Sequence, residues 1–280
     1  MKLIKIEYLK IILLSMSIFL YGCSENSSST ASSKKSEGEV IIRRNQEVAL
    51  SIDPMLHCTR ETYPWEKQCS YANSKITHDF FRCKGNSLNP PRIVNKEKES
   101  IRYYDCGGCL KHSLPLRNGK EFIYPILIDL LNDLQNKTGK RVIITSGHCC
   151  PEHSRYMSDL PAHLYSKHLI GAEVDFYIQG YEHEPQKVID ILLQYYQDNP
   201  KYQGKNSFTS FQRYSKENTN VSTLPWFNEE VFIKLFSCKE GRDFDNRHSH
   251  PYISIQVRYD WDLKKKVNYS SIEANNFYRY

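Results

Sequence analysis

The spacing of apolar residues predicts two amphipathic helices in the second half of the chain. Apolar side chains recur at intervals of three and four residues over 122–134, and Thr138-Gly139 ends that run. A second run with the same period begins near Pro185 and continues to Tyr196. This period places apolar side chains on one face of a helix, so we expect a helix in each segment.

Other segments have the composition or the alternation of strands. The segments that we expect to be strands are 141–145, 174–178 and 252–259. Residues 229–236 are helical or extended, whereas 146–165 and 202–225 are polar and irregular. A loop as long as 146–165 in a compact domain is often functional. The sum predicts an α+β protein with one catalytic domain of about 140 residues, an ordinary size for a single core.

The N-terminal residues resemble an export signal. Three lysines lie within residues 1–10, and residues 11–20 are almost wholly apolar but too few to span a bilayer as a stable helix. Leu20-Tyr21-Gly22-Cys23 resembles a bacterial lipobox, so we expect cleavage before Cys23 and lipidation of its thiol. Ser24 after that cysteine favours the outer membrane, with the protein facing the periplasm.

The segment after the lipobox has the composition of a tether. Residues 23–39 are rich in Ser and contain no aromatic residue, so they cannot bury enough surface to fold. Removing the three lysines and one glutamate of residues 1–22 lowers the formal charge from +6 to +4. A charge this mild does not indicate nucleic acid as a partner.

Cysteine usage agrees with export. Nine cysteines minus Cys23 leave eight, and an even number in an exported chain predicts up to four disulfides whose pairing stays open. Cys106-Gly107-Gly108-Cys109 has the spacing of half a zinc site or a redox pair, but no second C-x-x-C accompanies it, which favours disulfides. Adjacent Cys149 and Cys150 also fit disulfide partners better than a thiol nucleophile. Five of the eight lie in 40–118, which we interpret as a loop-rich, disulfide-stapled region.

One short segment carries candidate metal ligands. His168 and Asp175 lie seven positions apart, with Gly171 between them and a β-favouring run at 174–178. A turn at the glycine would bring the imidazole and the carboxylate together, and zinc accepts both. A hydrolytic zinc site usually has three protein ligands and a water, so a third ligand is needed. Its candidates lie in 245–250, just before the last expected strand.

The pattern S-x-H-x-x-G-x-A-x-D, followed much later by carboxylate-x-x-His or His-x-His, is typical of the zinc D-alanyl-D-alanine peptidases. The chain resembles this family over roughly residues 122–260, with Glu173 where the family usually has Ala. The matching positions are Ser166, His168, Gly171 and Asp175. The family includes D-Ala-D-Ala carboxypeptidases, VanX-like dipeptidases and L-Ala-D-Glu endopeptidases, and is related to the lysostaphin and hedgehog fold. The resemblance implies a small antiparallel sheet with flanking helices, one zinc ion per chain and hydrolysis of peptidoglycan peptides that contain D-amino acids.

Two registers remain open for the third ligand. In the first, Asp245 is the general base and His248 the ligand, because carboxylate-x-x-His is the family's spacing. In the second, His250 binds the metal and His248 stabilises the oxyanion, but Arg247 then stands where the base is needed. We favour the first register because the reaction requires a group that accepts a proton.

The resemblance also implies an arginine, in a segment like S-x-Y-R-S, that pairs with a substrate carboxylate or carbonyl. Cys149 holds that position here, and a thiol cannot replace the bidentate contact of a guanidinium. Arg155 or Arg247 then supplies the charge, or the substrate does not end in a carboxylate there. We assign substrate binding to Ser166 and Arg155. With Cys149 at the arginine position, endopeptidase cleavage stays open. A second alternative is a non-catalytic, zinc-stabilised protein that binds cell-wall peptide.

The expected partners are therefore peptidoglycan peptides and, through the lipid anchor, the membrane. The expected division of the chain is a signal peptide (1–22), a lipidated tether (23–39), a Cys-rich N-terminal region (40–118), a zinc peptidase-like domain (119–265) and a C-terminal tail (266–280).

Overall fold

A computed structural model describes residues 40–41, 50–51, 74–96, 99–158, 165–215 and 219–279. The chain divides into two compact units, residues 1–54 and 55–280. In the first unit, β1 (Val40–Ile41) and β2 (Leu50–Ser51) pair as antiparallel strands.

Several expectations concern residues that the structure does not describe. The expected signal peptide, the lipidated Cys23 and the tether lie outside the described residues, as do Cys58 and Cys69. Within the described residues, no helix is long and apolar enough to cross a membrane.

The second unit contains an antiparallel sheet of six described strands in the order β7-β8-β12-β11-β10-β9. The strands are β7 (Val142–Ser146), β8 (Glu173–Ile178), β9 (Gln212–Arg213), β10 (Trp226–Phe227), β11 (Val231–Phe236) and β12 (Tyr252–Val257). The strands expected at 141–145 and 174–178 are confirmed, and β12 covers most of the strand expected at 252–259. The segment 229–236, for which the sequence left helix and strand open, contains strand β11. Together with the helices, this antiparallel sheet makes the unit a mixture of helices and strands, which agrees with the predicted α+β class.

Alternation along β8 and β12 gives the sheet two different faces. Val174 and Phe176 are fully buried in the main hydrophobic core, whereas Glu173 and Asp175 alternate with them in the sequence and point to the opposite face. The register pairs Asp175 with Ser254 of β12, so the polar positions of the neighbouring strands meet on one side. The sheet therefore has one apolar face, which packs against the core, and one face that carries polar side chains.

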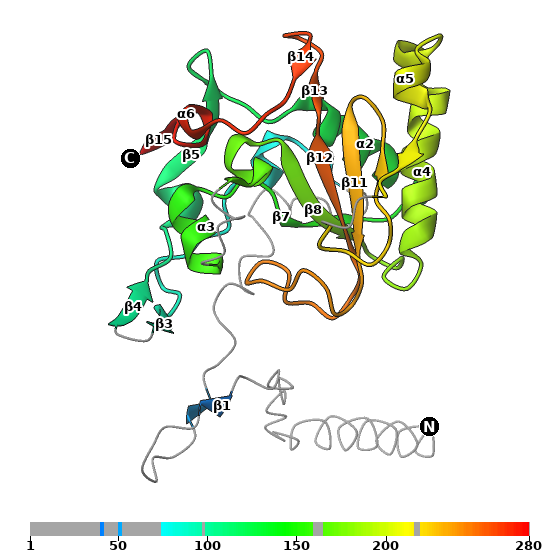
Figure 1. Ribbon diagram of the computed structural model, residues 1–280. Coiled ribbons are helices and arrows are strands. Elements are labelled where there is room, and N and C mark those ends of the chain that lie inside the picture. Colours follow the sequence, from blue (N-terminus) through cyan, green and yellow to red (C-terminus); the bar gives the residue numbers. More distant parts are fainter. Residues whose placement is uncertain are drawn as a thin grey trace, which may run out of the picture. The chain divides into compact units, whose positions relative to one another are not determined.

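Two helices cover the apolar face. They are α2 (Pro125–Thr138) and α4 (Pro185–Asp198), which pack against each other beside the sheet (Figure 1). Both begin with proline, which suits the first helical position because its missing N–H would have no partner there. Gly139 ends α2 with a φ of 63°, a left-handed conformation that glycine adopts without strain. Both predicted helices are confirmed, although α2 starts three residues later than 122.

The segment expected to be an irregular loop, 146–165, contains a helix. This helix is α3 (Pro151–Met157), and the Cys150 side chain caps it by accepting a hydrogen bond from the His153 N–H. A run of only seven residues with few apolar positions gives a weak periodic signal, which is why the pattern did not reveal it.

The remaining elements are short. They are η3 (His78–Phe81), β3 (Arg92–Lys96), β4 (Glu99–Tyr103), η4 (Gly108–Leu110), β5 (His112–Arg117), β6 (Lys120–Glu121), η6 (Lys167–Ile170), η7 (Pro200–Tyr202), α5 (Asn206–Thr209), β13 (Tyr259–Asp260), β14 (Lys265–Lys266), α6 (Ser271–Ala274) and β15 (Phe277–Arg279). Strand β5 pairs with both β6 and β15. The end of the region expected at 40–118 and the tail expected at 266–280 therefore belong to one small sheet.

Candidate functional site

Local backbone geometry places His168 at the edge of the polar face. Ser166 precedes η6, and its hydroxyl accepts a hydrogen bond of 3.2 Å from the His168 N–H. Gly171 ends η6 with a φ of 69°, and the chain turns there into β8. The turn that the sequence predicts between His168 and Asp175 is therefore present.

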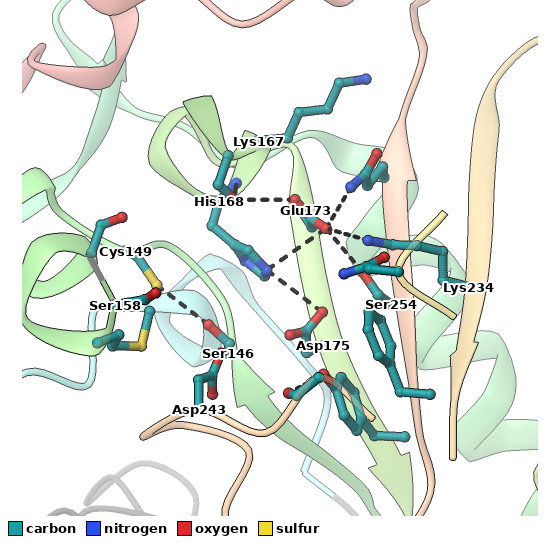
Figure 2. Close-up of a pocket in the computed structure, with 18 of the residues that line it drawn as sticks. Ser146, Cys149, Ser158, Lys167, His168, Glu173, Asp175, Lys234, Asp243 and Ser254 are labelled. Atoms are coloured by element: carbon teal, nitrogen blue, oxygen red, sulfur yellow. Dashed lines mark hydrogen bonds and ion pairs between the residues drawn. The ribbon is translucent and has the colours of Figure 1, made fainter. Parts of the chain in front are cut away.

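Three side chains converge at this point. His168 Nε2 lies 3.5 Å from Asp175 Oδ1 and 3.9 Å from Glu173 Oε1. One ligand atom from each of the three residues lies within 4.8 Å of the other two, and Figure 2 shows the imidazole facing both carboxylates. We call His168, Glu173 and Asp175 the His/Glu/Asp centre.

Hydrogen bonds orient the imidazole and one carboxylate of this centre. His168 Nδ1 lies 2.6 Å from the carbonyl oxygen of Gly147. A carbonyl only accepts, so Nδ1 donates and Nε2 is left to face the carboxylates. Asp175 Oδ2 accepts 3.0 Å from the Asn246 amide. Among the described residues, its buried Oδ1 has no hydrogen bond and only the ion-pair contact with His168 Nε2 at 3.5 Å. A buried carboxylate oxygen with so little compensation is costly unless something else binds it.

Glu173 is held by the neighbouring strands. Its Oε1 accepts hydrogen bonds from Ser254 at 2.9 Å and from Gln256 at 2.7 Å, and Lys234 lies 3.9 Å away. Ser166 donates to Oε2 over 3.3 Å. The second carboxylate is therefore fixed by β11, β12 and the residue that caps η6.

The two carboxylates set the charge of the imidazole. Burial alone would lower the pKa of His168, but the negative charges of Glu173 and Asp175 outweigh it and raise the pKa to about 10. Burial likewise opposes ionisation of Glu173, yet His168 and Lys234 lower its pKa to about 2. Without a metal, a proton on His168 balances the carboxylates, and a divalent cation is the natural replacement for that proton.

The centre opens into a cavity of about 510 Å³. All three residues line this cavity, together with Cys149, Asp243 and other polar groups that Figure 2 shows around the same space. A volume of this order is ordinary for a small-molecule or peptide site.

The structure does not group the predicted third ligand with the other two. Within the described part of the chain, Glu173 completes the set, and neither His248 nor His250 belongs to it. The two histidine rings instead lie 4.9 Å and 5.3 Å from the ring of Tyr177. The sequence contained the signal for Glu173: two residues before Asp175 on a strand, it must share the face of Asp175.

Asp245, the predicted general base, forms hydrogen bonds outside the His/Glu/Asp centre. Its carboxylate accepts from Ser146 at 3.0 Å and pairs with buried His153 at 3.2 Å, and His153 also contacts Asp105 at 2.6 Å. Asp243 lines the cavity, whereas Asp245 is not among its lining residues. Burial, followed by the negative charges of Asp245 and Asp175, raises the pKa of Asp243 to about 7.

The predicted substrate-binding residues have different surroundings. Ser166 lines the cavity, but Arg155 is exposed and lines a separate hollow. Arg247 stacks on Phe244 at 4.2 Å. Cys149, at the position where the resemblance implies an arginine, does line the cavity, and Lys234 is a cation that lines it as well.

The six described cysteines form no disulfide, so the disulfides expected among them are absent. Those six are Cys83, Cys106, Cys109, Cys149, Cys150 and Cys238.

Comparisons with protein-family models, with curated proteins and with solved structures found no match. Any functional conclusion therefore rests on the geometry described above and on the sequence motif.

Proposed function

We propose that this chain is a zinc-dependent peptidase that cleaves peptidoglycan stem or cross-link peptides containing D-amino acids. The observation that carries the proposal is the His/Glu/Asp centre on the wall of a polar cavity. The substrate class is supported by the resemblance of residues 166–175 to the zinc D-alanyl-D-alanine peptidases and by the export features of the N-terminus. The hedgehog-like variant of the α+β fold belongs to the same proposal.

The donor set fits a divalent cation. One imidazole nitrogen and two carboxylates are ligands that zinc accepts, and three protein ligands leave a position for water. Asp175 Oδ1, which is buried and makes no hydrogen bond to any described residue, is the oxygen that a metal ion would satisfy. When bound there, zinc would lower the pKa of a water molecule and polarise a peptide carbonyl.

Asp243 is the best-placed proton acceptor. Its carboxylate lines the cavity, and a pKa of about 7 suits a base that takes a proton and returns it near neutral pH. Its Oδ1 accepts hydrogen bonds from the N–H groups of Asp245 and Asn246 at 3.0 Å and 2.8 Å. These bonds fix the carboxylate, so it meets the substrate in one orientation. We therefore assign the role of base to Asp243 rather than to Asp245.

Lys234 is the candidate for the charge that the missing arginine would supply. Its ammonium group lies on the cavity wall, close to Glu173 and within 5.0 Å of the Phe236 ring centre. A point charge of this kind attracts a substrate carboxylate without the bidentate geometry of a guanidinium. Endopeptidase cleavage, which needs no terminal carboxylate, remains compatible with the site.

A protein that binds cell-wall peptide without cleaving it is the second candidate. The observation that favours it is Cys149, which lines the cavity where the resemblance implies an arginine. The proposed location, outside the cytoplasm with a lipid anchor at Cys23, is common to both candidates and rests on residues 1–39 of the sequence.

The deciding experiment measures product release by the full-length protein. Purified wild type is incubated with muropeptides, and the products are separated by chromatography and identified by mass spectrometry. We expect hydrolysis by wild type and none by His168→Ala, which removes the imidazole ligand. Binding of muropeptide and zinc without any product would establish the binding protein instead, and failure to bind either would overturn both candidates.

A further inference from the structure

A second group of metal-binding side chains lies outside the cavity described above. It consists of Cys83, Cys106, His112 and Cys150, which we call the Cys3His cluster. All four side chains are buried, and one ligand atom from each lies within 4.8 Å of the other three. They come from three separate parts of the chain: the segment after η3, the segment around η4 and β5, and the cap of α3.

The distances within the cluster fit a shared ion and exclude a disulfide. Cys83 Sγ lies 3.7 Å from Cys106 Sγ, whereas a disulfide requires about 2.05 Å. Cys106 Sγ lies 3.5 Å from His112 Nε2. Bonds of about 2.3 Å to sulfur and about 2.0–2.1 Å to nitrogen at tetrahedral angles separate the ligand atoms by about 3.8 Å and about 3.5 Å. The observed spacings therefore match the edges of one zinc tetrahedron.

The surrounding hydrogen bonds favour the protonation states in which these side chains bind a cation. His112 Nδ1 lies 3.1 Å from the Ser113 carbonyl oxygen, which only accepts, so Nε2 keeps its lone pair for the cluster. The Gly108 N–H donates to Cys106 Sγ and the His153 N–H to Cys150 Sγ, each over 3.3 Å. Backbone donors aimed at sulfur stabilise thiolate charge, which metal ligation requires.

The packing leaves no room for a substrate. A Cβ atom added at Gly85 would lie 2.2 Å from Cys106 Sγ, so the backbone there can approach the sulfur only because the residue is glycine. Phe277 packs against the cluster, with its ring 5.3 Å from the ring of His112. None of the four described ligands lines the cavity of the His/Glu/Asp centre.

We propose that the Cys3His cluster binds one zinc ion as a closed, structural centre. Four protein ligands complete a tetrahedron, which is the arrangement of structural rather than catalytic zinc. The ion takes the place of the thiol protons, which are released to solvent on binding. The ion would connect the segments that carry Cys83, Cys106 and His112 to Cys150 at the start of α3. Because Cys149, next to Cys150, and Ser154 of α3 both line the cavity, the same ion fixes one border of the cavity.

The test uses full-length His168→Ala, in which the His/Glu/Asp centre has lost a ligand. We expect this protein to retain about one zinc per chain by elemental analysis, against about two in wild type. Zinc X-ray absorption of the variant should show three sulfur neighbours at about 2.3 Å and one nitrogen at about 2.0–2.1 Å. This result does not depend on peptidase activity, so it stands or fails separately from the proposed function.

Variants then assign the ligands. In the His168→Ala background, Cys106→Ser should lose the zinc, whereas Cys109→Ser, three residues away and outside the cluster, should keep it. Gly85→Ala removes no ligand, yet its Cβ would displace Cys106 Sγ, so we expect faster loss of zinc to a chelator. If Cys106→Ser does not fold, the absorption spectrum of His168→Ala still decides.

Three results would overturn the proposal. They are a folded His168→Ala protein without zinc or with iron in its place, a zinc spectrum with nitrogen and oxygen neighbours only, and a Cys83–Cys106 disulfide in the non-reduced protein.

Discussion

The Cys3His cluster and the His/Glu/Asp centre differ in the way that separates structural from catalytic metal sites. The first has four candidate ligands, three of them with sulfur donors, which are buried and do not line the cavity. The second has three candidate ligands, one with nitrogen and two with oxygen donors, on the wall of a cavity of about 510 Å³. Four ligands complete a tetrahedron, whereas three leave a coordination position for water. The ligand sets therefore match the two roles that we propose, a structural zinc ion at the first centre and a catalytic one at the second.

The dipeptide Cys149-Cys150 joins the two centres. The Cys150 side chain belongs to the Cys3His cluster, and the Cys149 side chain lines the cavity (Figure 2). Gly147, two residues earlier, accepts the hydrogen bond that orients His168. A Cβ at Gly147 would lie 2.6 Å from the backbone of Phe81, so the segment also packs closely against η3. Displacement of this short segment would therefore disturb both centres.

The largest expected effect is a difference in stability between variants of these two adjacent cysteines. Cys150→Ser should prevent stable folding, because structural zinc contributes about 10–16 kcal/mol in small zinc domains and a whole domain has only about 5–15 kcal/mol. Cys149→Ser should unfold cooperatively at a temperature close to wild type, because its thiol is not a ligand of the cluster. Thermal unfolding followed by circular dichroism gives the comparison. Equal unfolding temperatures for the two variants would show that Cys150 has no structural role.

The next effect concerns the chemistry of the cavity. Asp243→Asn should keep zinc at the His/Glu/Asp centre but lower kcat by about 10²–10⁴-fold, because an amide cannot accept the proton. Asp245→Asn should lower kcat less and instead lower stability by about 1.5–3 kcal/mol, since it weakens a hydrogen bond to buried His153. Muropeptide turnover and urea unfolding measure the two quantities. The reverse pattern, with Asp245→Asn the less active variant, would return the role of base to Asp245.

A third effect is the pH dependence of metal binding at the His/Glu/Asp centre. The pKa of His168 is raised to about 10, so the metal-free site carries this proton at neutral pH and must release it when zinc binds. Zinc affinity at this centre should therefore rise by about tenfold per pH unit between pH 6 and 8. Competition with a coloured chelator measures it, with the Cys3His cluster already loaded. An affinity that does not change with pH would mean that zinc displaces no proton from His168.

The elements with strong periodicity were predictable from the sequence, and the centres only in part. The apolar faces of α2 and α4 and the turn at Gly171 follow from local spacing and from glycine geometry. His168 and Asp175 are close in sequence, so their pairing followed from the same turn. Glu173 was overlooked because the resemblance assigned alanine to its position, although the alternation of β8 places it beside Asp175.

The Cys3His cluster was beyond sequence reasoning for a physical reason. Its ligands come from segments as far apart as Cys83 and Cys150, and only the packing of η4, β5 and α3 brings them together. Cys106 and Cys109 have the spacing of a common zinc motif, yet only Cys106 belongs to the cluster. An even number of cysteines, in a chain that the sequence led us to expect to be exported, indicated disulfides, which would use the same thiols in another way.

The smallest expected effect tests the ligand set of the His/Glu/Asp centre. Loss of a hydrogen-bond partner of a metal ligand typically lowers metal affinity by about tenfold. His248→Ala should change zinc affinity at this centre by less than that, because His248 is not a member of the centre. Its ring lies 4.9 Å from that of Tyr177 and 5.7 Å from that of Tyr252, and burial followed by Arg242 lowers its pKa to about 4. A neutral imidazole of this kind is able to bind zinc, so the comparison with His168→Ala is informative. Zinc titration of both variants at one pH decides: loss of affinity in His168→Ala alone supports Glu173 as the third ligand. Equal loss in both would place His248 on the metal and require the loop of residues 237–251 to move when zinc binds.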